Sequence, residues 1–181
     1  AYDEIRKRNN EIVDNEARQI AKEIAISAIR YYMIKHDTGK SIVFDINNSL
    51  SLDGDTGPYI QYSYARGNRI FNKVKDRIDF LKDYEISSLH LDLVQIEIDL
   101  IKHLTKFSIT IKESIDNQEP KLVANYLFLL STLFNHFYER SPIIKEEDRL
   151  KKRARIEILR ASLLIMHHCM NIIGITLLEK M

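Results

Sequence analysis

The sequence predicts an all-α fold, and three observations support that class. The chain has 181 residues but only five Gly and three Pro, which leaves few turns and favours long helices over many short strands. Apolar residues make up 45% of the chain and recur at intervals of three and four, the period of an amphipathic helix. The length is sufficient for one sizeable core. We therefore expect a bundle of about five helices.

The first predicted helix runs from Asn15 to near His36, with Asp14 as its candidate cap. Its apolar stripe consists of Ala17, Ile20, Ala21, Ile24, Ala28 and Tyr31 or Tyr32. The sequence Thr-Gly-Lys-Ser at 38–41 is not a phosphate-binding loop, because the first glycine of that motif would fall on Ile34. A short apolar piece at 42–45, which could be extended, and a polar turn at 53–55 lead to the next helix.

The second long helix should begin at Gly57, because Asp55 and Thr56 are good N-cap residues and Pro58 is tolerated in a first turn. The stripe that we expect to be buried consists of Ile60, Tyr64, Gly67, Phe71, Val74 and Ile78. A connection at 81–88 follows, with Ser87 or Ser88 as a candidate cap.

The segment 89–115 alternates in part like a strand, but its length, its lack of Gly and Pro and its helical spacing favour a helix with a break near 105–108. Pro120 should open another helix that ends at Tyr138, before Ser141 and Pro142. The core residues predicted there are Val123, Tyr126 or Leu127, Leu130, Phe134 and Phe137.

The last predicted helix starts within 145–149 and ends at Gly174. Its apolar residues keep a spacing of four and three: Ile156, Leu159, Leu163, Met166, Met170 and Ile173. This repeat also fits a coiled coil, but with fewer than four heptads a bundle core is favoured.

Composition restricts the class of partner and the compartment. The net charge of +1 does not by itself indicate a nucleic-acid partner, so any such site must come from a local arrangement. Cys169 is the only cysteine, which excludes an intramolecular disulfide and fits a reducing compartment. No run approaches the length of a membrane span, and we expect a cytoplasmic protein without a membrane partner. The start, charged and without Met, is typical of an excised fragment.

Aromatic and positive residues share the face of the 57–78 helix opposite its apolar stripe. They are Tyr59, Tyr62, Arg66, Arg69 and Lys73. Flat rings beside guanidinium groups suit stacked bases and phosphates. The alternative is ordinary packing, since tyrosine often lies half-buried between helices and charged faces are usually solvated.

Five positive charges lie within seven residues at 149–155, the start of the last helix. The helix dipole disfavours cations at that end, so an anionic partner explains the cluster better than helix stability does. Lys151, Lys152 and Arg153 are therefore candidate phosphate contacts, with Arg69 and Lys73 as further ones. A merely solvated charge run is the alternative.

His167, His168 and Cys169 are adjacent, which is not the spacing of zinc ligands, and we predict no metal site. No serine, histidine and aspartate arrangement or cysteine and histidine pair indicates a catalytic nucleophile either. We expect no catalytic residue in this chain.

Three stretches resemble the C-terminal anticodon-binding (DALR) domain of arginyl-tRNA synthetases. These are DTGPYIQYSYAR at 55–66, LVANYLFLLSTLFNHFY at 122–138 and NIIGITLLEKM at 171–181, in the order and at the separations of that family. The stretch VFDINNSLSLDGDTGPYIQYSYAR also resembles the family's junction between catalytic domain and bundle. The chain departs from the family in having Leu177 or Leu178 where the ending usually has proline, and KKRARIEILRASL matches the DALR run only in pattern.

The resemblance implies that 1–54 are a catalytic-domain remnant with a connector and that 55–181 form the bundle. It also implies that five residues contact the anticodon of tRNA-Arg: Tyr59, Tyr62, Arg66, Tyr138 and Met181. The parent enzyme would be a monomeric arginine–tRNA ligase that uses ATP with magnesium, and arginine; the fragment itself needs no cofactor and binds no DNA. Two alternatives are a separate DALR-type protein that binds tRNA for a modification partner, and a helical interaction bundle without an RNA role.

Overall fold

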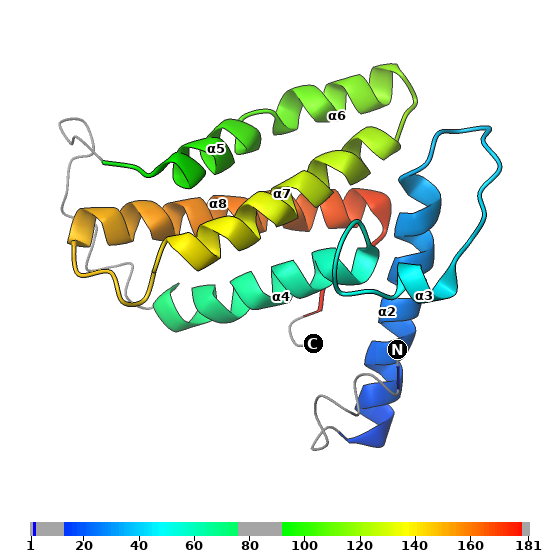
Figure 1. The fold of residues 1–181 in the computed structure, drawn as a ribbon, viewed down its shortest axis with the longest axis horizontal. Helices are drawn as coiled ribbons and strands as arrows, with labels where there is room; N and C mark the ends of the chain where they lie inside the picture. Colours follow the sequence, from blue (N-terminus) through cyan, green and yellow to red (C-terminus); the bar gives the residue numbers. More distant parts are fainter. Residues whose placement is uncertain (1, 3–12, 76–91, 179–181) are drawn as a thin grey trace.

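The computed structural model describes residue 2, residues 13–75 and residues 92–178, and within these ranges every regular element is a helix. Figure 1 shows α4, α7 and α8 side by side, with α5 and α6 along one edge and α2 crossing the end of the bundle steeply. The helices are α2 (Asp14–Ile34), α3 (Ile46–Ser49), α4 (Gly57–Val74), α5 (Gln95–Leu104), α6 (Phe107–Asp116), α7 (Lys121–Arg140) and α8 (Arg149–Ile173). The all-α prediction is confirmed.

Local sequence signals explain most of the helix ends. Thr56 caps α4, where its hydroxyl oxygen accepts a hydrogen bond of 3.2 Å from the backbone N–H of Tyr59. Asp148 caps α8 by accepting from the backbone N–H groups of Leu150 and Lys151 at 2.8 and 3.1 Å. Gly174 ends α8 with φ +72°, a left-handed conformation that favours glycine. At α2 the prediction was off by one residue, because Val13 is the cap and Asp14 is the first helical residue.

The predicted break in the 89–115 segment is confirmed. Thr105 and Lys106 separate α5 from α6. Helix α5 begins at Gln95, and the side chain of Glu97 accepts a 3.0 Å hydrogen bond from the backbone N–H of Val94, the residue before this start. The predicted cap at Ser87 or Ser88 lies outside the described residues, as does Ile78. Residues 42–45 contain no regular element, and Asp45 caps the short helix α3.

The core lies where α4, α7 and α8 meet. All six predicted core residues of α8 are buried, and so are the predicted ones of α7, including Phe134 and Phe137. A Cβ atom at Gly67 would come within 2.8 Å of the side chains of both Phe134 and Leu163, so the glycine lets α4 approach α7 and α8 closely. The stripe of α4 is rotated from the prediction: Ser63 and Ile70 are buried, whereas Tyr64 and Phe71 are half-buried.

The chain after α8 packs into the space between α2 and α4. Ile175 and Leu178 are buried. The Thr176 carbonyl accepts a 2.9 Å hydrogen bond from the Gln61 amide, and the Thr176 backbone N–H donates to the Ser27 hydroxyl at 3.2 Å. The segment therefore ties α2 to the bundle instead of extending into solvent.

One helix of the described residues, α8, is long and apolar enough to cross a membrane, with a mean hydropathy of 1.3 over its most apolar window. The expectation that no run approaches such a length was therefore wrong. Half of the most apolar stretch of α8 is buried against the rest of the bundle.

Candidate nucleic-acid interface

The polar face of α4 is formed by residues spaced three and four apart, which places them along one side of the helix. Tyr62 has 36% of its surface exposed, and Arg69 and Lys73 are also exposed. Tyr59 and Arg66 are half-buried, because each of them contacts α7. The face thus combines three exposed side chains, those of Tyr62, Arg69 and Lys73, with two side chains that contact α7.

The end of α7 brings Tyr138 to this face. The guanidinium carbon of Arg66 lies 3.9 Å from the centre of the Tyr138 ring, a cation–π contact, and one guanidinium nitrogen lies 3.9 Å from a carboxylate oxygen of Glu139. The side chain of Arg66 is 27% exposed. Its charge is therefore oriented by two neighbours while part of the group still meets solvent.

Tyr59 is fixed from two sides. Its ring centre lies 5.8 Å from that of Phe128, and its hydroxyl oxygen accepts a 3.0 Å hydrogen bond from the Asn135 amide. The structure therefore gathers Tyr59, Tyr62, Arg66 and Tyr138 on adjoining parts of α4 and α7. Met181, the fifth predicted anticodon contact, lies outside the described residues.

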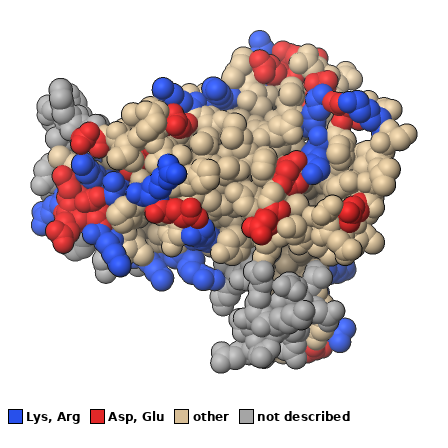
Figure 2. Space-filling view, viewed as in Figure 1, with Lys and Arg blue, Asp and Glu red and all other residues tan. Residues whose placement is uncertain are grey.

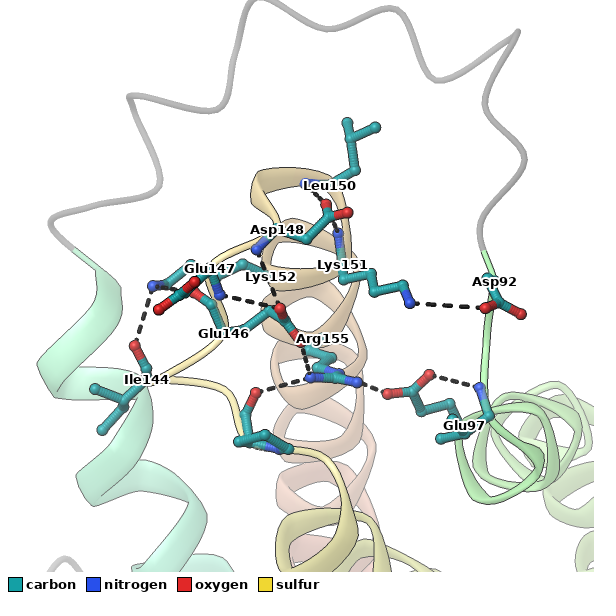
Figure 3. A network of polar contacts seen from close by, with 12 residues as sticks. Asp92, Glu97, Ile144, Glu146, Glu147, Asp148, Leu150, Lys151, Lys152 and Arg155 are labelled. Carbon is teal, nitrogen blue, oxygen red and sulfur yellow. Dashed lines mark hydrogen bonds and ion pairs between the residues drawn. The ribbon is translucent and has the colours of Figure 1, made fainter.

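A second group of charges covers the end of the bundle where α8 begins. Figure 2 shows Lys and Arg there with Asp and Glu among them, whereas much of the middle of this face carries neither. Lys151 lies 3.7 Å from a carboxylate oxygen of Asp92. Lys152 donates hydrogen bonds of 3.0 and 2.9 Å to the carbonyl oxygens of Ile144 and Glu146 (Figure 3). Lys152 thus holds the α7–α8 loop, and Arg153 is half-buried beside it.

Arg155, the last cation of the 149–155 cluster, points inward. Its guanidinium donates to Glu97 at 2.6 Å, to the Pro142 carbonyl at 2.9 Å and to Glu146 (Figure 3). Burial would raise the pKa of Glu97, but the hydrogen bonds from Arg155 and from the Val94 backbone N–H bring it below its ordinary value. This network joins α5, the α7–α8 loop and α8, and it holds the basic end in place.

The adjacent His167, His168 and Cys169 have packing partners. The His167 ring lies 6.4 Å from that of Tyr64, and the His168 ring lies 6.4 Å from that of Phe107. Cys169 is fully buried, and its burial raises the pKa of the thiol to about 12. These three residues therefore serve the contact of α8 with its neighbours.

Sequence reasoning missed Asn135, Glu139 and Glu97, which act through partners on other helices. Asn135 could have been noticed, because it is an amide placed between the core residues Phe134 and Phe137. Glu97 offered no such signal, since it stands in a segment of alternating apolar and acidic residues.

Comparison with known proteins adds a family match. Residues 60–181 match the family model described as the DALR anticodon binding domain. An arginine–tRNA ligase of Clostridium beijerinckii is 34% identical over 177 residues, which are 98% of this chain and 30% of that protein. One of Methanocorpusculum labreanum is 33% identical over 181 residues, which are 100% of this chain and 31% of that protein.

Solved structures agree with these sequence matches. An arginyl-tRNA synthetase of Plasmodium falciparum superposes with a TM-score of 0.84 at 26% identity, covering 100% of this chain and 31% of that one. An arginyl-tRNA synthetase of Thermus thermophilus superposes with a TM-score of 0.82 at 25% identity, covering 99% of this chain and 30% of that one. The chain thus spans about a third of the length of the relatives that it matches.

Proposed function

The chain belongs to the DALR anticodon-binding domain family, and from this membership we propose that it recognises the anticodon loop of tRNA-Arg as part of an arginine–tRNA ligase. The family match covers residues 60–181, which include α4 from Ile60 onward and all of α5 to α8, and Tyr59 lies directly before it. Recognition is proposed as positioning: the bundle holds the anticodon while the acceptor end reaches an active site elsewhere in the enzyme.

The contact between Arg66 and Tyr138 is the observation that carries this proposal. It places the Arg66 guanidinium group of α4 and the Tyr138 ring of α7 beside the exposed ring of Tyr62. Unpaired bases stack on aromatic rings and on guanidinium planes, and phosphate oxygens accept hydrogen bonds from arginine. An anticodon loop offers both unpaired bases and phosphates.

Aminoacylation belongs, in this proposal, to the part of the ligase that lies outside this chain. ATP, magnesium and arginine would bind there, and the chain alone would catalyse no step. We further propose that the parent enzyme is monomeric and cytoplasmic, and that its nucleic-acid partner is tRNA and not DNA.

A binding titration tests the proposal. The chain is titrated with tRNA-Arg, with tRNA-Arg whose central anticodon cytosine is replaced by guanosine, and with an unrelated tRNA, all at one salt concentration, because such affinities depend strongly on salt. We expect tRNA-Arg to bind most tightly. Equal affinity for all three RNAs would contradict anticodon recognition.

A further inference from the structure

A hydrogen-bond network behind the α4 face determines which way the Tyr59 hydroxyl donates. The Ser63 hydroxyl donates to the Tyr59 carbonyl oxygen at 2.8 Å, one helical turn earlier. A serine hydroxyl has one hydrogen, so Ser63 can only accept from any further partner. That partner is Asn135, whose side-chain nitrogen lies 2.8 Å from the Ser63 oxygen.

This chain of donors fixes the orientation of the Asn135 amide. Its NH2 group must face Ser63, and the same nitrogen lies 3.0 Å from the Tyr59 hydroxyl oxygen. The Asn135 carbonyl oxygen is left buried without a partner among the described residues. The single hydrogen of Ser63 is already donated to the Tyr59 carbonyl, so only this orientation keeps the hydrogen bond between Asn135 and Ser63, although it leaves a buried oxygen unpaired at a cost in free energy.

Tyr59 consequently accepts from Asn135, and its own hydroxyl hydrogen must point elsewhere. No acceptor for that hydrogen is found among the described residues. Tyr59 is half-buried, its ring packs against Phe128, and it shares the α4 face with Tyr62 and Arg66. The hydroxyl is thus a donor for which the described residues supply no acceptor.

We propose that Asn135 is a positioning residue that fixes the Tyr59 hydroxyl as a hydrogen-bond donor to RNA. This inference rests on the proposed function. The group on the RNA is an acceptor: a carbonyl oxygen or ring nitrogen of an unpaired base, or a phosphate oxygen. Asn135 itself does not touch the RNA and acts through Tyr59.

A double-mutant cycle tests the proposal with the full chain and a 17-nucleotide anticodon stem-loop of tRNA-Arg. Tyr59→Phe removes the hydroxyl. Asn135→Asp replaces the NH2 group by an acceptor, so that the hydroxyl turns inward to donate to the carboxylate. Each single variant should bind about five- to tenfold more weakly, the effect of one hydrogen bond. The double variant should bind no more weakly than either single one.

A purely structural role of Asn135 would give a different result. Losses that multiply in the double variant, or an Asn135→Asp affinity within twofold of the wild type, would overturn the proposal. Should Asn135→Asp not fold, Asn135→Ala takes its place in the cycle, with an expected loss of about threefold that vanishes in the Tyr59→Phe background. Ser131→Ala is the matched control, because Ser131 carries a buried hydroxyl on α7 that donates to the Leu127 carbonyl of its own helix.

Two further comparisons separate the possible outcomes. If the acceptor is on the central base, the effect of Tyr59→Phe on affinity should vanish with a stem-loop whose central cytosine is replaced. If the acceptor is a phosphate oxygen, that effect should be unchanged. Either result supports the donor role. A wild-type chain that binds the stem-loop no better than a scrambled hairpin would overturn the proposed function and the inference together. Normal wild-type binding without coupling would overturn the inference alone.

Discussion

The guanidinium carbon of Arg66 lies 3.9 Å from the centre of the Tyr138 ring, so the middle of α4 is joined to the last turn of α7 at the surface. Both residues were singled out from separate stretches of the sequence, and the packing of α4 on α7 brings them into contact. Gly67, the neighbour of Arg66, permits the close approach of the two helices. The candidate interface therefore depends on the core directly behind it.

Glu97 should be important for stability. Glu97→Ala leaves the buried Arg155 with Glu146 as its remaining carboxylate partner, and we expect the free energy of unfolding to fall by about 3 kcal/mol. Glu157→Ala is the control, because Glu157 pairs with Arg160 on the exposed side of α8 and should cost less than about 1 kcal/mol. Urea unfolding curves measure both, and equal losses would contradict the role given to the network.

His103 should make stability depend on pH. Burial lowers its pKa more than the hydrogen bond to the Tyr126 carbonyl raises it. Below the ordinary value of 6.5 the unfolded chain takes up a proton that the folded chain still lacks, so stability should fall as the pH drops from 7.5 to 5.5. His103→Gln should reduce this difference in melting temperature. An unchanged difference would exclude His103 as its source.

The basic residues should differ in their effect on the salt dependence of tRNA binding. We consider two double variants, one that combines Arg69→Gln with Lys73→Gln and one that combines Lys151→Gln with Arg153→Gln. Each should reduce the slope of log K against log salt by up to about 0.9 for each phosphate that the variant no longer neutralises. Lys152→Gln should instead lower stability, because its ammonium group bonds two carbonyl oxygens of the α7–α8 loop. A slope unchanged in both double variants would show that these charges are only solvated.

Met181 tests the resemblance most narrowly. We expect that deleting Met181, or adding a tag after it, weakens discrimination for the central anticodon cytosine with little change in melting temperature. Ile175 and Leu178 anchor the preceding residues in the fold, which is why the change should leave stability nearly intact. The intact, truncated and extended chains are titrated with tRNA-Arg and its anticodon variant. Equal discrimination by all three chains would show that Met181 has no role in recognising the anticodon.

Features that depend on neighbours in sequence could be predicted. The apolar spacing of α8 predicted six of its buried apolar residues but not Ile158 or Cys169, and Thr56 with Pro58 predicted the start of α4. Features that depend on partners from other helices could not. Arg155 stands among cations in the sequence, yet it turns inward because Glu97 comes from α5.

The candidate site shows the same division. Tyr59, Tyr62 and Arg66 follow from helical spacing and from the family resemblance, since both are visible in one stretch of sequence. The hydrogen bond from Asn135 to Tyr59 follows only from the way α7 packs on α4. The rotation of the α4 stripe has the same origin, because Gln61 and Ser63 gain polar partners in α2, α7 and the C-terminal segment.

The affinity of Arg66→Ala for tRNA-Arg, measured beside its melting temperature, tests the proposed interface most directly. Arg160→Ala serves as the control for loss of a charge, because Arg160 is an exposed arginine of α8. We predict that Arg66→Ala weakens binding by about 1 to 3 kcal/mol while the free energy of unfolding changes by less than about 1 kcal/mol. Normal tRNA binding by an Arg66→Ala variant that melts much earlier than the wild type would contradict the proposed interface and leave Arg66 a structural role.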